Sequence, residues 1–260
     1  MNKTIGVITN DATNIFQRQV IAGIRAVADQ RGYAVHIESH THPNSTLNHE
    51  AVAGILVIAN VLPDAELRQL YASGKPLSLV SHRVRYTPIP AVIPDNTGGI
   101  CALVDYLVAR GKHRIAFIQG DMNQNDGIER TNAFRRQLMR HNIPIDERLF
   151  LRGDFEPSIA RQSMRTFLAD NIAFDAVAGA DFLLAITARD VLIEAGRADG
   201  MCVVGFGDGI EAAQANLTTV GVDVEQLGIR ATRQLIGQIE GLKMCGITIL
   251  STSIVERESC

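Results

Sequence analysis

Short apolar runs rich in β-branched residues alternate with longer amphipathic stretches along almost the whole chain. The first run, TIGVIT (Thr4–Thr9), precedes a stretch over 17–31 with the spacing of an amphipathic helix, which Gly32 ends as a C-terminal cap. The apolar face of that helix consists of Val20, Ile21, Ile24, Val27 and Ala28. The same alternation predicts strands at 33–38, 54–59, 76–80, 114–119, 174–179 and 201–206, and helices at 64–73, 97–110, 127–141 and 182–195.

Strands that alternate with helices predict parallel sheets with helices on both faces. The two halves of the chain, 4–92 and 96–219, have a similar build, with PDN (94–96) and LTTVGVD (217–223) as the crossings between them. We therefore expect an α/β fold of two similar Rossmann-like lobes, joined by crossover segments, with a ligand cleft between them. Such an arrangement suits a protein that closes around a small molecule.

Polar residues follow the predicted strands. Right-handed crossovers place the loops after parallel strands along one edge of a sheet, where ligands bind in folds of this class. We expect these side chains to converge on one crevice, although polar residues also populate loops for no functional reason. They are Asn10, Asp11, Asn60, His82, Arg83, Asp121, Asp181 and Asp208.

Two phenylalanines and one arginine are further candidates for ligand binding at that edge. Phe16 stands where the first helix begins, and Phe155 stands in the polar loop GDFEPS. Aromatic faces stack on sugars or nucleobases, and a guanidinium such as that of Arg130 binds several acceptors at once. Core packing is the alternative for either ring, but the polar context favours a ligand contact.

Composition narrows the function classes. With 46% hydrophobic and 20% charged residues and a net charge of −3, the chain is typical of a soluble protein and lacks the basic field that attracts nucleic acid. No run of about 18 apolar residues and no signal peptide is visible, so we expect a cytoplasmic protein without a membrane span. The four cysteines form no CxxC pair and are expected to be reduced thiols: Cys101, Cys202, Cys245 and Cys260.

No motif nominates an enzyme, a metal or a cofactor. GFGDGI follows a strand, but its G-x-G-x-G spacing is not the dinucleotide pattern, and glycines that let the backbone turn beside a ligand explain it better. The sequence lacks the G-x-S-x-G motif of serine hydrolases, and no paired carboxylates flank a position expected in the cleft. One segment is rich in histidine without zinc-site spacing, and a solvated loop accounts for it: His36, His40, His42 and His49.

Several motifs, in order along nearly the whole chain, resemble the effector-binding domain of the LacI family of regulators. The opening TNDATNIFQRQVIAGIRAVADQRGY is similar to the start of that domain. The further matches are VSHR, PDNTGG, RGKHRIAFIQG, ERTNAFRRQL, GDFEPS, VVGFGD, LTTV and VERESC. The resemblance implies the two-lobed fold of periplasmic binding proteins, with a small-molecule effector in the cleft. We assign 1–94 plus 222–245 to an N-terminal lobe and 96–220 plus 247–260 to a C-terminal lobe.

The resemblance also implies a set of effector contacts, to which the strand-end pattern adds Asn60. Arg130 stands in the family's usual arginine position, and Phe155 is the next best match. The ten candidate ligand-binding residues are Phe16, Gln17, Asn60, His82, Gln124, Asp126, Arg130, Phe155, Asp181 and Asp208.

The chain departs from the family pattern at several positions. Ile15 replaces the usual proline, His82 stands where an acid is frequent, and Gly207 takes the place of the first acid before Asp208. Only about a dozen residues separate the second and third strands, too few for a full helix with its turns. That helix should be truncated or missing, which puts the family's usual dimer in doubt.

The helix-turn-helix head expected before TIGVIT is missing, and three explanations stay open. The chain is a trimmed repressor, the sensory module of a larger cytoplasmic signalling protein, or a periplasmic sugar-binding protein of a transport system. We favour an effector-binding sensory domain that signals by lobe closure. The expected partner is a sugar, nucleoside or related metabolite, with a homodimer and a DNA-binding or signalling output domain left open.

Overall fold

The computed structural model describes residues 3–39 and 49–260. The chain divides into two units, each built from discontinuous segments. Unit 1 comprises Met1–Pro94 and Asp223–Leu250, and unit 2 comprises Asp95–Val222 and Ser251–Cys260. The chain therefore passes between the units three times.

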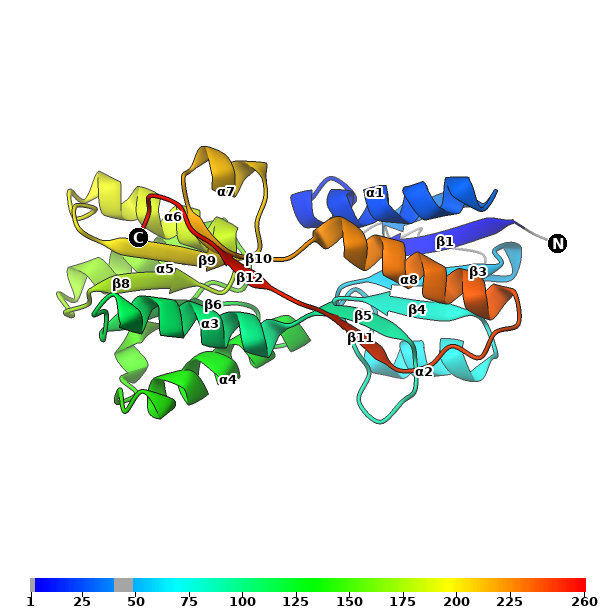
Figure 1. Ribbon diagram of the computed structural model, residues 1–260, viewed down its shortest axis with the longest axis horizontal. Helices are drawn as coiled ribbons and strands as arrows, with labels where there is room; N and C mark the ends of the chain where they lie inside the picture. Colours follow the sequence, from blue (N-terminus) through cyan, green and yellow to red (C-terminus); the bar gives the residue numbers. More distant parts are fainter. Residues whose placement is uncertain (1–2, 40–48) are drawn as a thin grey trace. The chain divides into compact units, whose positions relative to one another are not determined.

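Unit 1 is built on a six-stranded parallel sheet with the order β11-β5-β4-β3-β1-β2 (Figure 1). Its strands are β1 (Thr4–Thr9), β2 (Ala34–Ser39), β3 (Gly54–Ile58), β4 (Leu77–Val80), β5 (Ala91–Pro94) and β11 (Ile247–Leu250). Its helices are α1 (Ile15–Gln30), α2 (Asp64–Ala72), α8 (Val224–Ile239) and the short 3-10 helix His49–Ala51.

Local sequence explains the central elements of unit 1. All five residues of β3 are buried, as expected for a strand covered by helices on both faces. The Asn14 side chain accepts a hydrogen bond from the backbone N–H of Phe16 and caps α1 at its N-terminus. Helices α1 and α8 lie side by side (Figure 1). They approach closely because a Cβ atom on Gly23 would lie 2.1 Å from the Glu225 carbonyl oxygen.

Unit 2 contains a second six-stranded sheet with the order β12-β10-β9-β8-β6-β7. Its strands are β6 (Ile115–Gln119), β7 (Phe150–Arg152), β8 (Ala176–Gly179), β9 (Cys202–Phe206), β10 (Thr218–Gly221) and β12 (Ser253–Val255). Its helices are α3 (Asn96–Ala109), α4 (Asn125–Arg140), the 3-10 helix Glu147–Leu149, α5 (Pro157–Ala169), α6 (Phe182–Glu194) and α7 (Ile210–Gln214). The pairing is parallel except between β10 and β12, which run antiparallel.

The core of unit 2 is centred on aromatic side chains. Phe117 of β6 and Phe134 of α4 stack with ring centroids 4.2 Å apart, and Phe150 meets both rings edge-on. Phe117 and Phe134 are completely buried. These contacts hold α4 against the sheet, and α4 carries two of the candidate ligand-binding residues, Asp126 and Arg130.

The structure has the α/β architecture expected from the sequence, with two mainly parallel sheets. The antiparallel β10–β12 pair is the one exception to the expected parallel pairing among the described strands. Between β2 and β3, only one 3-10 turn is described, His49–Ala51. The rest of the segment in which we expected a truncated helix lies outside the described residues, as do His40 and His42.

The expectation of four reduced cysteines is wrong for one pair. Cys202 and Cys260 form a disulfide, whereas Cys101 and Cys245 are free. Fifty-eight residues separate the two partners in the sequence, so their spacing gives no sign of the pairing. They meet because the segment after β12 runs beside β9, where the Val203 amide donates to the Ser259 carbonyl oxygen (2.8 Å).

Candidate functional site

The carboxyl ends of β4, β3 and β1 are neighbours in unit 1 and carry four candidate residues. At the end of β1, the buried Gln17 side chain donates to Asn10 Oδ1 and accepts from the Asp11 amide (3.4 Å). Gln17 therefore fixes the loop that leads into α1. Phe16, the next residue back, is half-buried in the first turn of that helix.

His82 and Asn60 follow the other two strands of this edge. His82 is only 3% exposed, and its Nε2 atom lies 3.0 Å from Asp64 Oδ1 at the start of α2. The imidazole therefore joins the end of β4 to α2. Asn60 follows β3 and is exposed. The structure thus places Asn60 and His82 after neighbouring strands, one exposed and one enclosed by protein.

In unit 2, Arg130 of α4 is the centre of a buried polar network. Its Nε atom donates to Asn96 Oδ1 (2.8 Å), and its Nη1 atom donates to the Ala180 carbonyl oxygen (2.9 Å). Its Nη2 atom donates to Asp126 Oδ2 (3.3 Å), one helical turn away. The guanidinium also lies 3.9 Å from the Phe206 ring centroid. Burial lowers the pKa of Arg130, and nearby carboxylates oppose that shift.

Asn96 is a member of this network that sequence reasoning missed. Its side-chain amide donates to both Asp126 Oδ1 and Glu129 Oε2, each at 2.9 Å, while its oxygen accepts from Arg130. Asn96 is 2% exposed at the start of α3. From the sequence, Asn96 was recognised only as part of the PDN crossing, because an asparagine that starts a helix carries no sign of a partner 34 residues away.

Phe155 lies against the end of β6. A Cβ atom on Gly120 would come within 2.1 Å of the Phe155 ring, so only glycine leaves room for the ring there. The Phe155 backbone has φ = 59°, in the left-handed region that is unfavourable for a bulky residue. The ring centroid lies 5.8 Å from the Arg130 guanidinium. The structure therefore brings Phe155, Arg130 and Asp126 together in unit 2, and their role as ligand contacts stays a prediction.

Asp181 follows β8 and caps α6. Its side chain accepts a hydrogen bond from the Leu184 amide (2.7 Å). Burial raises the pKa of the Asp181 carboxyl, although the Leu184 hydrogen bond and the charge of Arg130 act in the opposite direction. Asp181 thus belongs electrostatically to the same region as Arg130.

Asp208 and Gln124 have other partners. Arg257 holds both Asp208 oxygens through Nη1 and Nη2, each at 2.9 Å, and Thr219 Oγ1 adds a third bond at 3.0 Å. Gln124 donates to Asp121 Oδ2 (3.0 Å) in the loop before α4. Sequence reasoning missed Arg257, although its place in the VERESC motif could have drawn attention to it.

The described residues contain neither a cluster of potential metal ligands nor a helix that could span a membrane. Within 3–39 and 49–260, no group of three or more His, Cys, Asp or Glu side chains is arranged to hold a metal ion. No described helix has the length and apolar character needed to cross a membrane.

Comparison with known sequences points to one family. Residues 104–260 match the family model for the periplasmic binding protein-like domain. The HTH-type transcriptional regulator CelR of Thermobifida fusca is 27% identical, over 94% of this chain and 76% of its own. The HTH-type transcriptional repressor PurR of Erwinia tasmaniensis is also 27% identical, over 99% of this chain and 80% of its own.

Solved structures confirm the predicted α/β fold. The complex of the transcriptional regulator CelR with cellobiose has a TM-score of 0.87 and 26% identity, over 99% of this chain and 84% of that chain. The lac repressor dimer bound to operator and the anti-inducer ONPF has a TM-score of 0.87 and 24% identity, over 100% of this chain and 82% of that chain. These relatives are transcription regulators rather than enzymes, in agreement with the expectation from the sequence.

Proposed function

The chain belongs to the family of periplasmic binding protein-like effector domains found in LacI-type regulators, and we propose that it is a cytoplasmic sensory domain that signals by lobe closure. In this proposal, one small-molecule effector binds at the carboxyl ends of the strands. A ligand shifts a conformational equilibrium only by its differential affinity for the two states. The effector must therefore contact residues from both lobes.

The buried network around Arg130, next to the Phe155 ring, is the observation that carries this proposal. Asn96, Asp126 and the Ala180 carbonyl fix the guanidinium before any ligand arrives. A guanidinium has five N–H donors, and these three acceptors leave it further capacity to bind an effector. Phe155, packed on Gly120, supplies a rigid apolar face beside it. Prearranged groups of this kind bind a ligand at a small entropic cost.

We propose a sugar, a nucleoside or a related metabolite as the effector. Each of these classes combines a ring face for Phe155 with oxygen or nitrogen acceptors for Arg130. The CelR relative, with 26% identity, forms a complex with cellobiose, so β-linked disaccharides belong among the first compounds to test. The candidate contacts in unit 1, Phe16 and His82 foremost, remain predictions.

We further propose that the signal reaches an output domain outside this chain and that the chain forms a homodimer. A net charge of −3 does not favour nucleic-acid binding by this chain itself. The lac repressor relative is a dimer bound to operator DNA. Sedimentation velocity at micromolar concentration tests the dimer directly, and a monomer at all concentrations would reject it.

One observation favours a second candidate, a periplasmic sugar-binding protein of a transport system. The Cys202–Cys260 disulfide is of a kind that persists in oxidising compartments and is rare in the cytosol. The native gene distinguishes the two candidates. An encoded signal peptide favours transport, and an encoded helix-turn-helix or signalling domain favours regulation.

A thermal-shift screen tests effector binding. The full chain is heated with mono- and disaccharides, nucleosides, purines and sugar phosphates, each at millimolar concentration. A ligand present at 100 times its Kd adds about 2.7 kcal/mol to the free energy of unfolding, which raises Tm by several degrees. A shift with NAD or ATP alone would contradict the proposal and favour a nucleotide-using protein.

Calorimetry with the compound identified then tests the site. We expect Arg130→Ala to weaken effector binding by about 2 kcal/mol, roughly 30-fold, because it removes a buried charge-assisted hydrogen bond. Arg136→Ala, an exposed arginine on the same helix, is the matched control and should bind normally.

Arg130 also holds the local structure together, so a second variant is needed. Phe155→Ala leaves the Arg130 network intact and removes the half-buried ring. It should weaken binding by about 1 kcal/mol or more through the lost stacking. Unchanged affinity in both variants would exclude this edge of unit 2 as the effector site.

A further inference from the structure

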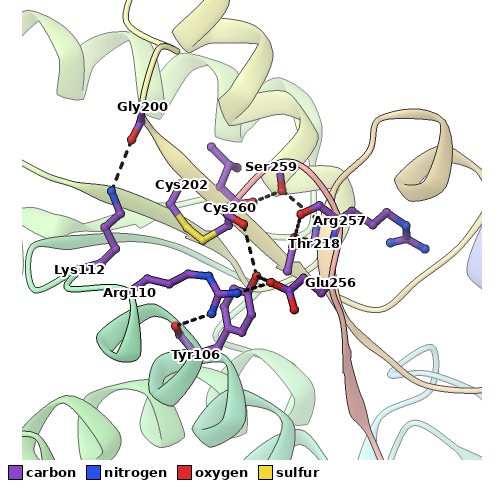
Figure 2. The surroundings of a disulfide bond; sticks show 11 residues. Tyr106, Arg110, Lys112, Gly200, Cys202, Thr218, Glu256, Arg257, Ser259 and Cys260 are labelled. Carbon is purple, nitrogen blue, oxygen red and sulfur yellow. Dashed lines mark hydrogen bonds and ion pairs between the residues drawn. A yellow bond between two sulfur atoms is a disulfide. The ribbon is translucent and has the colours of Figure 1, made fainter.

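The last six residues of the described chain lie along two strands of unit 2. The Val203 amide of β9 donates to the Ser259 carbonyl oxygen (2.8 Å), and Ser259 Oγ donates to the Val203 carbonyl oxygen (2.6 Å). Ser259 Oγ also accepts from the Thr218 amide of β10 (2.8 Å). At the end of this track, Cys260 is joined by the disulfide to Cys202, the first residue of β9 (Figure 2).

The other end of the same track carries an ion pair. Arg257 binds both oxygens of Asp208, which follows the carboxyl end of β9. The Arg257 amide also donates to Thr218 Oγ1 (2.9 Å), so this residue is tied to the sheet through its backbone as well. The segment is thus clamped at the amino end of β9 by a covalent bond and at the carboxyl end of β9 by a salt bridge.

A groove of about 670 Å³ opens at the disulfide, and both cysteines line it. Three cationic side chains also line this groove: Arg110, Lys112 and Arg189. Arg110 and Lys112 lie near the disulfide in Figure 2. Lys112 Nζ donates to the Gly200 carbonyl oxygen (3.4 Å), and Arg110 is paired with Glu256. Arg189 Nη1 donates to the Ala215 carbonyl oxygen, but the Arg189 Nε atom is buried without a hydrogen-bond partner.

Arg110 is already paired with Glu256, so Lys112 and Arg189 are the cations of the groove that are left to attract an anionic ligand. Two acids, Glu258 and Asp199, also line the groove, and Glu258 already accepts a hydrogen bond from the Asn216 side chain (3.0 Å). A buried N–H that lacks an acceptor is costly, and a ligand oxygen can satisfy it. Cationic surroundings also stabilise thiolates, the reactive form in disulfide exchange.

We propose that the Cys202–Cys260 disulfide is a reversible redox link and that the groove admits a small, carboxylate-bearing thiol, of the tripeptide-thiol class, to reduce it. The carboxylates of that thiol would pair with the cations, while its sulfur reaches the disulfide. Cys260 is the first target because it is partly exposed, whereas Cys202 is buried.

The exchange balances in two steps. The thiolate of the small thiol attacks Cys260 Sγ, a new sulfur–sulfur bond forms, and Cys202 leaves as a thiolate that takes up a proton. A second thiolate then attacks the small thiol's own sulfur in the mixed disulfide, and Cys260 leaves as a thiolate that is protonated in turn. The protein disulfide gains two electrons, and two small thiols become one oxidised dimer.

Reduction removes the covalent end of the clamp. The segment then depends on its hydrogen bonds and on the Arg257–Asp208 pair, and a segment that has lost its covalent anchor opens more readily. Hydrogen exchange should therefore quicken at the amides of Val203 and Thr218 and along 256–260. The redox state is thereby transmitted from one end of β9 to the carboxylate at its other end, whatever the effector is.

Thiol counting tests the link itself. The full chain, purified without reductant, is incubated in glutathione buffers of defined redox ratio, alkylated and weighed by mass spectrometry. The oxidised protein should show two reactive thiols, Cys101 and Cys245, and the reduced protein four. A glutathione adduct should appear on Cys260 in between. Four thiols without any reductant, or a link that survives millimolar glutathione in the folded protein, would overturn the proposal.

Reduction rates test the groove. Glutathione is compared with the neutral thiol 2-mercaptoethanol on the wild type and on Lys112→Ala. Loss of one partly exposed charge should slow the glutathione reaction about two- to fivefold and leave the neutral thiol unaffected. Lys243→Ala, an exposed lysine of unit 1, is the matched control for net charge and should not change either rate. If Lys112→Ala slowed reduction by the two thiols equally, or slowed neither, the proposal that the groove binds an anionic thiol would be rejected.

Hydrogen exchange tests the consequence of reduction. Cys260→Ser cannot form the link and should reproduce the faster exchange of the reduced wild type at Val203, at Thr218 and along 256–260. Reductant should then change nothing further in that variant. Identical exchange in oxidised and reduced wild-type protein would show that the disulfide does not hold the segment, contrary to the proposal.

Discussion

Asp181 lies where the ionised form of its carboxyl is disfavoured. Burial raises the pKa of its carboxyl above the ordinary value, even though the Leu184 amide and Arg130 favour the ionised form. Its capping hydrogen bond to Leu184 needs only an oxygen acceptor, which an amide side chain supplies equally well. The charge of Asp181 is therefore separable from its structural role.

We expect Asp181→Asn to raise the free energy of unfolding at neutral pH. A carboxyl whose pKa is raised by folding binds more protons in the folded than in the unfolded state, so its contribution to stability falls as pH rises between the two pKa values. The gain from the substitution should thus be largest at neutral pH and vanish below about pH 4, where wild-type Asp181 is protonated in both states. Urea unfolding from pH 4 to pH 8 measures this difference.

Asp223→Asn is the matched control for this substitution. Asp223 caps α8 through the Gln226 amide (3.1 Å) but is exposed. Its replacement should leave stability nearly unchanged at every pH. A gain of equal size in both variants, or a loss for Asp181→Asn at pH 7, would mean that burial of charge is not what distinguishes Asp181.

At the scale of helices and strands, elements with strong local signals were predictable. The strand Thr4–Thr9 was predicted with the bounds observed, and β3 is buried throughout, as its continuous apolar run indicates. Helix α1 begins at Ile15, two residues before the predicted start, because Asn14 supplies the cap. For such elements, apolar periodicity and end signals reflect the same burial that stabilises them.

Elements defined by distant partners were not predicted. β5 follows Pro90 and ends at Pro94, and these prolines argue against a strand until β4 and β11 are known to flank it. β11 and β12 are short and depend on partners more than 30 residues away. Helix α5 buries only Ala160, Met164 and Phe167 among its 13 residues, a narrow stripe that is easily overlooked.

The candidate site, too, was predictable in part. Its position after the strand ends followed from the order of strands and helices, but the pairing of its side chains did not. Asp208 was predicted as a ligand contact, yet Arg257 from 49 residues away holds both its oxygens. Partners of this kind are set by how the C-terminal segment lies on the sheet, which local sequence does not encode.

The α1–α8 packing provides a test at this scale. A Cβ atom on Gly228 would lie 2.1 Å from the Val20 carbonyl oxygen, a rigid backbone atom. Alanine normally favours a helix over glycine by up to about 1 kcal/mol. We nevertheless expect Gly228→Ala to lower the free energy of unfolding by about 1–3 kcal/mol, because the two helices must move apart. Urea unfolding measures the change.

Gly237→Ala, on the same helix, is the control. There, the nearest atom to an added Cβ is the Met244 Cγ at 3.2 Å, part of a flexible side chain. This variant should be neutral or gain up to about 1 kcal/mol. If both variants were equally stable, the helices would not be as close as the structure places them.

Each of the two units has its own hydrophobic core. The described core of unit 2 contains buried residues from Ile100 to Val220 and none from unit 1. A cluster under β3 and β4 belongs entirely to unit 1, from Ile8 to Ala91. Damage to one core should therefore appear first in its own unit.

We expect Phe134→Ala to cost about 3–5 kcal/mol, since it empties a completely buried site against Phe117. Hydrogen exchange should quicken in β6, β8 and α4 well before it does in β1 and β3. Mass spectrometry of peptides from both units measures this, with the wild type as reference. Equal acceleration in both units would indicate that the chain unfolds as one cooperative body.

The three passages between units have a consequence for synthesis on the ribosome. In unit 1, β11 forms one edge of the sheet, and α8 packs on α1, β3, β4 and β5. Both elements belong to the second segment of this unit, Asp223–Leu250. Unit 2 has completed its buried core by Val220. Unit 2 can thus fold before unit 1 is complete. Until α8 has been synthesised, the surface of unit 1 that α8 later covers stays exposed. Chaperone occupancy during translation should be concentrated on unit 1 until residue 239 leaves the exit tunnel.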